Sequence, residues 1–174
     1  AGEVLVQAAR AVITAHLTGA SDDGALAALR QAAELERSRG LFVTLRKHGA
    51  LRGCMGRIES DTPLNELLPV VALEAALHDP RFSPLRREEL DDIKIEVSIL
   101  SPPRPVSETE EIVPGRDGVV LRKSGRTGVF LPQVWIETGW TKVKFLQELA
   151  SQKAGLSPDA WQFSQLLIFQ DQTF

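Results

Sequence analysis

One short segment of the chain combines a thiol, a guanidinium and two glycines. Residues 51–56 read Leu-Arg-Gly-Cys-Met-Gly, and Cys54 is the only cysteine among 174 residues. In a regular β-strand, Arg52 and Cys54 point to the same face with Cα atoms roughly 7 Å apart. A guanidinium at that range favours thiolate over thiol and lowers the pKa of the cysteine. We therefore predict a reactive or ligand-contacting thiol, with Gly53 and Gly56 leaving an open groove around it.

The same residues also fit a purely structural role. A cysteine outside a disulfide is among the most buried residue types and commonly packs as a small hydrophobic side chain. Glycine beside Cys54 in a strand can also relieve crowding under a packed helix. The residues alone leave both interpretations open.

A second group of candidates lies at the end of an expected helix, where the sequence reads His78-Asp79-Pro80-Arg81-Phe82. Arg81 is a candidate donor to an anion and His78 a candidate acid or base, with Asp79 and Phe82 beside them. Helix termination explains the same residues, because histidine complements the dipole at a helix C-terminus and Asp-Pro starts a turn. These four residues are therefore candidate binding residues with a structural alternative.

Glu96 is the third candidate for chemistry. It alternates with apolar residues in a strand and shares its face with Lys94 and Ser98, so the face borders either solvent or a site. Spacing alone establishes no Ser-His-Asp or Cys-His pairing.

A locally basic stretch raises the question of nucleic-acid binding. Cations that could contact phosphates occur at Arg116, Arg122, Lys123 and Arg126. Charges on a hairpin also block edge-to-edge pairing of sheets, which is the interpretation we favour. The chain carries 20 Lys and Arg against 23 Asp and Glu, a net charge of −3, whereas nucleic-acid binders are normally basic. We do not expect nucleic acid as the main partner, although a local patch remains compatible with it.

Composition and cysteine count narrow the class of protein. Hydrophobic residues make up 43% and charged residues 25%, the mixture of a globular domain. One cysteine forms no internal disulfide, which favours a reducing, cytoplasmic setting. The three histidines lie far apart, so we predict neither a metal site nor a cofactor. No apolar run approaches the length of a membrane span, and the first residues do not resemble a secretory signal.

Hydrophobic periodicity predicts the elements that position these residues. Apolar spacing of three and four predicts helices over residues 5–16, 25–39, 63–77 and 143–154, with Pro69 kinking or breaking the third. Alternation predicts hairpins over 41–58 and 118–131, and single strands over 93–99 and 163–169. Helices bracket hairpins instead of alternating with single strands, so the predicted class is α+β, with a mixed or antiparallel sheet and flanking helices.

Several strings in this order resemble the AMMECR domain family. From Gly40 onward they are 40–45 (Gly-Leu-Phe-Val-Thr-Leu), 51–56, 79–82 and 95–98 (Ile-Glu-Val-Ser). Residues 128–134, 139–140 and 153–156 are similar to the bacterial branch, protein A of the AmmeMemoRadiSam system. Met55 stands where the family typically has isoleucine. Ala150 and Ser151 stand where many relatives have a second cysteine, so no mechanism here needs one.

The resemblance implies one AMMECR-like domain over residues 1–174, with a larger and a smaller lobe and a cleft between them. It implies no settled biochemical activity, and whether the protein is an enzyme stays open. It also implies possible partners, a Memo-like protein and a radical S-adenosylmethionine (SAM) enzyme, in a three-part modification system. The motif residues that carry over are Arg52, Gly53, Cys54, Asp79, Arg81, Phe82 and Glu96, and we expect Cys54, Arg52 and Glu96 to face the cleft. The alternative is a non-catalytic binding module in which Cys54 is structural.

Overall fold

The computed structural model describes residues 1–174, which form two compact units. Unit 1 contains residues 1–100 together with 172–174, and unit 2 contains residues 101–171. Both units combine helices with a four-stranded antiparallel sheet, so the predicted α+β class is confirmed. The cleft expected between two lobes stays a prediction.

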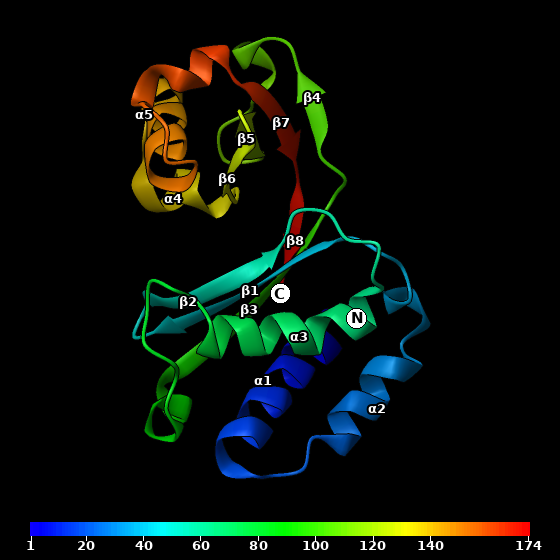
Figure 1. Ribbon diagram of the computed structural model, residues 1–174. Helices are drawn as coiled ribbons and strands as arrows, with labels where there is room; N and C mark the ends of the chain where they lie inside the picture. Colours follow the sequence, from blue (N-terminus) through cyan, green and yellow to red (C-terminus); the bar gives the residue numbers. More distant parts are fainter. The chain divides into compact units, whose positions relative to one another are not determined.

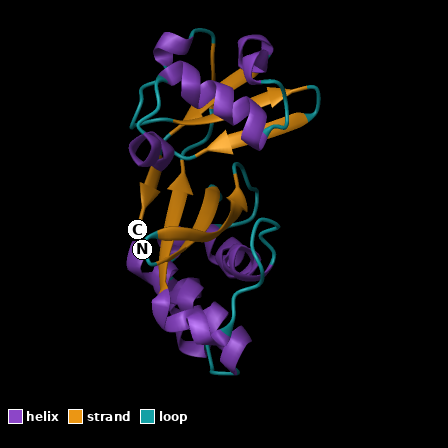
Figure 2. Cartoon of the chain, turned by 90° about the vertical axis from the view of Figure 1, so that its left-hand side faces the viewer, coloured by secondary structure: helices purple, strands orange, loops and turns teal.

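Unit 1 is a sheet covered by helices on one face (Figures 1 and 2). Its helices are α1 (Gly2–Thr18), α2 (Asp23–Gln31) and α3 (Leu64–Leu77), with 3₁₀ turns η1 (Ala33–Leu35) and η2 (Arg87–Asp92). Its strands, in the sheet order β2-β1-β3-β8, are β2 (Ala50–Arg57), β1 (Gly40–Lys47), β3 (Ile93–Leu100) and β8 (Asp171–Thr173). Helices α1 and α3 pack on the sheet, and α2 packs on α1.

Strand alternation determines which residues enter the core of unit 1. Leu41, Val43 and Leu45 of β1 point toward the helices and are fully buried. Ile95 and Val97 of β3 join them in the same cluster. The residues between them, such as Thr44 and Glu96, therefore occupy the opposite face of the sheet.

The β1–β2 hairpin contains a β-bulge that the sequence analysis did not anticipate. His48 and Gly49 form the connecting turn with φ values of 51° and 80°, which fits a two-residue hairpin loop. Pairing runs from Lys47 opposite Ala50 to Arg46 opposite Leu51, and then continues with Leu45 opposite Gly53. Arg52 is thus an additional residue without a partner in β1, and the strand is not regular at the point where the motif begins.

The two glycines of the motif are explained by close packing. A Cβ atom on Gly53 would lie 2.3 Å from the backbone oxygen of Ala75 in α3. A Cβ atom on Gly56 would lie 2.5 Å from the ring of Phe42 and 2.2 Å from the backbone oxygen of Leu41. The space expected for a groove at these glycines is therefore occupied by protein atoms.

Unit 2 is a smaller sheet with its own core. Its strands, in the order β4-β7-β5-β6, are β4 (Arg104–Val106), β7 (Gln165–Phe169), β5 (Gly118–Lys123) and β6 (Arg126–Phe130). Its helical elements are η3 (Thr109–Glu111), α4 (Gln133–Thr138), α5 (Lys142–Glu148), the π-helix η4 (Leu149–Lys153) and η5 (Pro158–Phe163). Trp135 and Phe145 stack at 3.6 Å between ring centroids in its core, where both are buried.

Three helix predictions need correction. Helix α3 runs through Pro69, so the expected break into two helices does not occur, while the alternative of a kink stays a prediction. The helix expected over 25–39 ends at Gln31, because Ala32 adopts an extended conformation and the next turn buries Leu35. The helix expected over 143–154 changes to a π-helical turn at Leu149.

The chain ends meet in unit 1. The main chain of Phe174 exchanges two hydrogen bonds with Val97 of β3, and its ring packs on Gly2 of α1 (Figure 2). No helix of the structure has both the length and the apolar character to cross a membrane.

The contact between Gly53 and α3 gives a testable prediction about the sheet that carries the motif. Gly53→Ala should lower the free energy of unfolding by about 1–3 kcal/mol, because the added methyl overlaps a helix backbone atom that cannot move by itself. Gly24→Ala is the matched control, because Gly24 lies in α2 with nothing within 4 Å of the added atom. The control should raise stability by about 0.5 kcal/mol. Urea unfolding of both variants tests this, and equal stabilities would contradict the packing argument.

Candidate functional site

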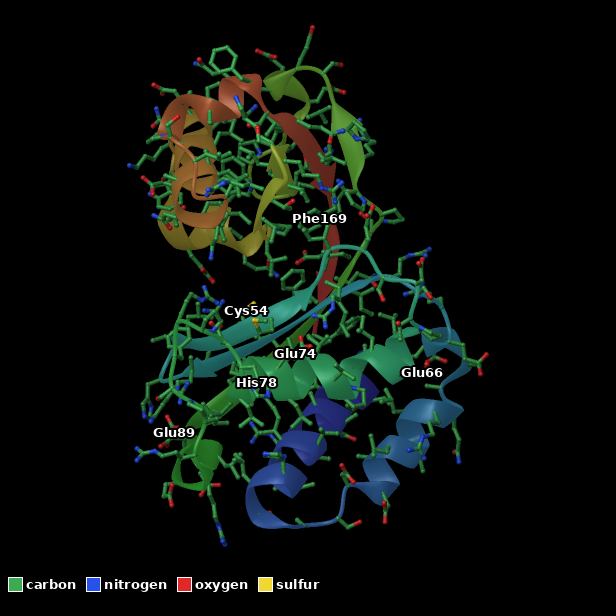
Figure 3. All side chains as sticks on the ribbon, in the orientation of Figure 1. Cys54, Glu66, Glu74, His78, Glu89 and Phe169 are labelled. Carbon is green, nitrogen blue, oxygen red and sulfur yellow. The ribbon has the colours of Figure 1, made fainter.

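The central feature of the site is a row of polar side chains across three strands of unit 1. Thr44 of β1 lies opposite Cys54 of β2 on one side and Glu96 of β3 on the other. The Thr44 hydroxyl and the Cys54 sulfur are 3.3 Å apart, within hydrogen-bond distance for sulfur. Cys54 is half-buried, and Figure 3 shows its sulfur at the sheet. The row therefore places a thiol, a hydroxyl and a carboxylate on the face opposite α3.

The carboxylate of Glu96 is balanced by cations on the same face. Arg46 approaches it to 3.3 Å, and Lys94 lies 3.9 Å away. Glu96 is thus an ion-paired carboxylate on β3, the strand next to the one that carries Thr44.

A carboxylate–guanidinium pair attaches to the edge of β2 at the cysteine. The backbone N–H of Cys54 donates to Asp79 Oδ2 at 2.9 Å, and Arg81 Nη2 donates to the carbonyl oxygen of Cys54 at 3.4 Å. Arg81 also donates to both oxygens of Asp79, from Nε at 3.0 Å and from Nη2 at 2.8 Å. Because β2 is an edge strand, Asp79 and Arg81 satisfy main-chain groups that a further strand would otherwise pair.

Arg52 is held by a different carboxylate. Its Nε and Nη2 donate to the two oxygens of Glu89 in η2, at 3.0 and 3.1 Å. Lys47 also donates to Glu89, at 3.0 Å. The guanidinium of Arg52 is therefore committed to Glu89, and the guanidinium that reaches the backbone of Cys54 is that of Arg81.

Both anchoring carboxylates are buried and have low pKa values. Burial alone raises the pKa of Asp79, but the hydrogen bonds from Arg81 and from the backbone of Cys54 outweigh it and lower the pKa to about 2. For Glu89 the hydrogen bonds from Arg52 are the largest cause, and they lower the pKa to about 2 despite burial. The pKa of Arg81 is raised, first by its hydrogen bond to Asp79 and to a lesser degree by the charge of Cys54. Both carboxylates are therefore ionised over the physiological range.

The structure brings together some of the predicted residues and separates others. Cys54, Asp79 and Arg81 are in direct contact, and both Arg52 and Arg81 lie over the ring of Phe82, at 6.0 and 5.5 Å. His78 is exposed at the end of α3, one helical turn from Glu74 (Figure 3).

The basic residues of unit 2 have contacts of their own. Arg116 pairs with Asp117 at 2.8 Å, Lys123 lies over the ring of Phe163, and Arg126 donates to the carbonyl oxygen of Gly155. Arg116 therefore has a carboxylate partner within its own unit.

Residues 6–174 match the AMMECR1 family. The chain belongs to this family. Protein MK0488 of Methanopyrus kandleri is 40% identical over 99% of this chain and 87% of its own length, and a protein of Methanothermobacter thermautotrophicus is 42% identical over 92% and 85%. The crystal structure of the uncharacterized protein PH0010 from Pyrococcus horikoshii matches with a TM-score of 0.88 and 36% identity, over 99% of this chain and 89% of that one.

Thr44 and Glu89 are site residues of this AMMECR1-family chain that the sequence analysis missed. The alternation of β1 assigns Thr44 to the polar face, but only the bulge places it opposite Cys54. Glu89 lies in a charged run, Arg86 to Asp92, where nothing distinguishes it from its neighbours. Its donors Lys47 and Arg52 are distant in the sequence, and only the third, the backbone N–H of Arg86, is a local capping contact.

The low pKa of Asp79 predicts a pH-dependent stability. Asp79 contributes stability above about pH 4, its unfolded-state range, and that contribution is lost as the pH falls toward about 2. Asp79→Asn should therefore cost about 2 kcal/mol at pH 7, and the difference from wild type should shrink below pH 4. Asp91→Asn is the control, because Asp91 is exposed and makes no ion pair. Denaturant unfolding at several pH values measures both, and a difference that does not change with pH would contradict the assignment.

Proposed function

We propose that this AMMECR1-family protein is the thiol-bearing component of a modification system, with Cys54 as nucleophile or covalent carrier. The observation that carries the proposal is the cross-strand row in which the Thr44 hydroxyl lies 3.3 Å from the Cys54 sulfur. A hydroxyl at this distance can donate to a thiolate and stabilise it. Arg81 adds a positive charge on the other side of the cysteine.

Glu96 is the candidate proton acceptor of the site. It lies opposite Thr44 in the adjacent strand, so side chains on the same face of the two strands are neighbours. In the proposal the proton of Cys54 leaves toward Glu96 through the intervening hydroxyl or through solvent. Arg46 then holds the carboxylate in place.

The partners are proposed from the resemblance to the bacterial AmmeMemoRadiSam branch. They are a Memo-like protein and a radical SAM enzyme, with this chain supplying the thiol. Co-purification of the three proteins, with and without Cys54→Ser, tests this part. If the three proteins do not associate at micromolar concentrations, the proposed partnership is wrong. That result would not bear on the proposed reactivity of Cys54.

A binding module with a structural cysteine is the second candidate. Two observations favour it. Both Arg52 and Arg81 are already held by carboxylates, and the side chain within hydrogen-bond distance of the sulfur at Thr44 is a hydroxyl and not a base. In that case Thr44 and Cys54 simply satisfy each other within the sheet. The reactivity of the thiol separates the two candidates.

The rate of Cys54 alkylation by iodoacetamide as a function of pH is the deciding measurement. With one cysteine, every adduct reports this site. For an activated thiol we expect half of the maximal rate below about pH 8.5, the midpoint for an ordinary cysteine. Thr44→Val should move that midpoint upward, because it removes the hydroxyl that faces the sulfur. A thiol that reacts only after unfolding would overturn the proposal in favour of the binding module.

Ser98→Ala is the matched control for Thr44→Val. Ser98 lies on the same face of the sheet, opposite Phe42, and its hydroxyl bonds Thr173 and not the cysteine. It should leave the alkylation midpoint unchanged. An equal shift in both variants would show a general loosening of the sheet instead of a specific contact.

A further inference from the structure

The surroundings of Cys54 contain two arginines whose positions are fixed but whose donors are only partly used. Arg52 and Arg81 each give Nε and Nη2 to one buried carboxylate. Neither Nη1 atom has a hydrogen-bond partner within the chain, and neither is among the buried unpaired polar atoms. Arg81 is 41% exposed. Arg52 is 13% exposed. Both guanidinium groups therefore keep unused N–H donors, and those of Arg81 are the more accessible to a ligand.

The two guanidinium groups share one aromatic neighbour. Their central carbons lie 6.0 and 5.5 Å from the centre of the Phe82 ring. The buried carboxylates of Asp79 and Glu89 each bind the Nε and Nη2 edge of one guanidinium group. A guanidinium fixed in this way loses little conformational freedom when it binds a ligand, so its remaining donors are pre-organised.

The charge balance leaves this cluster positive. Glu89 supplies one negative charge to two cations, Arg52 and Lys47. Asp79 balances Arg81 one to one. The five groups together therefore carry one unneutralised positive charge beside Cys54, which favours an anion.

We propose that Arg52 and Arg81 form an anion-binding site over Phe82, and that the electrophile taken by Cys54 carries a carboxylate or a phosphate. This inference rests on the proposed function and names the substrate class for the same thiol. In the reaction the sulfur forms a bond to an electrophilic carbon of the substrate. The leaving group departs with its electron pair, and the thiol proton goes to Glu96 or to solvent. The guanidinium groups hold the anionic end and do not take part in bond making.

Two alkylating agents of similar size, one anionic and one neutral, test the proposal. Both iodoacetate and iodoacetamide lose iodide to the Cys54 thiolate as a carbon–sulfur bond forms. The ratio of their rates in the native protein should exceed the ratio in the urea-unfolded chain by about fivefold, the effect of one charge pair at about 4 Å in water. At 1 M NaCl, where the Debye length is about 3 Å, the native ratio should fall to the unfolded value.

A paired substitution assigns the effect to the site. Asp79→Asn with Arg81→Gln removes the guanidinium that hydrogen-bonds the backbone of Cys54 and leaves no buried carboxylate without a cation. The net charge of the cluster does not change, so the expected fall of at least twofold in the preference for iodoacetate reports the lost donors of Arg81. Arg57→Gln with Glu74→Gln is the matched control, because it removes another bidentate pair between β2 and α3 that does not contact Cys54. The control should keep the wild-type ratio. A native thiol that reacts equally with both agents, or a ratio unaffected by salt, overturns the anion site and leaves the proposed function intact.

A second readout applies if the thiol proves inert. Inert Cys54 overturns the proposed function, and the anion site is then decided by inorganic phosphate alone. Phosphate should raise the unfolding temperature above that in chloride of equal ionic strength, and the Asp79→Asn, Arg81→Gln protein should lose that increase. Equal temperatures in phosphate and chloride overturn the anion site.

Discussion

The β-bulge at Arg52 decides which face of the sheet carries the thiol. Counting from Lys47 opposite Ala50 without a bulge would place Cys54 opposite Val43, whose side chain lies in the core under the helices. The additional residue shifts the pairing by one, so that Cys54 lies opposite Thr44. Since side chains alternate between faces, one residue is enough to transfer the cysteine from the core to the polar face. The contact with Thr44 and the distance to Glu96 both depend on this shift.

The buried carboxylates connect the stability of unit 1 to its chemistry. Burying Asp79 or Glu89 is costly unless each lone pair finds a donor, and the structure supplies those donors from arginines and backbone N–H groups. The arginines that satisfy the carboxylates are also the cations beside Cys54. Asp79 in addition protects the N–H of an edge strand. Replacing either carboxylate alone therefore changes both the stability of unit 1 and the positions of the cations near Cys54. For this reason, replacing Asp79 together with Arg81 is more informative than replacing one of them.

Local patterns in the sequence predict the helices and strands better than they predict the contacts around Cys54. Alternation over residues 93–99 and the turn at His48 and Gly49 depend on neighbouring residues, and the structure has the strand and the hairpin there. The bulge depends on how β2 docks under α3, where Gly53 meets Ala75, and no local signal encodes that contact. Helix α3 is likewise continuous through Pro69, where local propensity favours an interruption, and its apolar residues pack in the core of unit 1.

In the proposed mechanism, the role of Arg46 follows from what a thiolate at Cys54 requires. A carboxylate without a cation near Cys54 would disfavour the charged sulfur, so Glu96 could accept a proton only at the expense of the nucleophile. Arg46, with Lys94 further away, balances Glu96 within the same face. Arg81 acts from the opposite edge, through the backbone of Cys54. The sulfur thus lies between two ion pairs whose cations offset their carboxylates, and the neutral hydroxyl of Thr44 lies 3.3 Å from it.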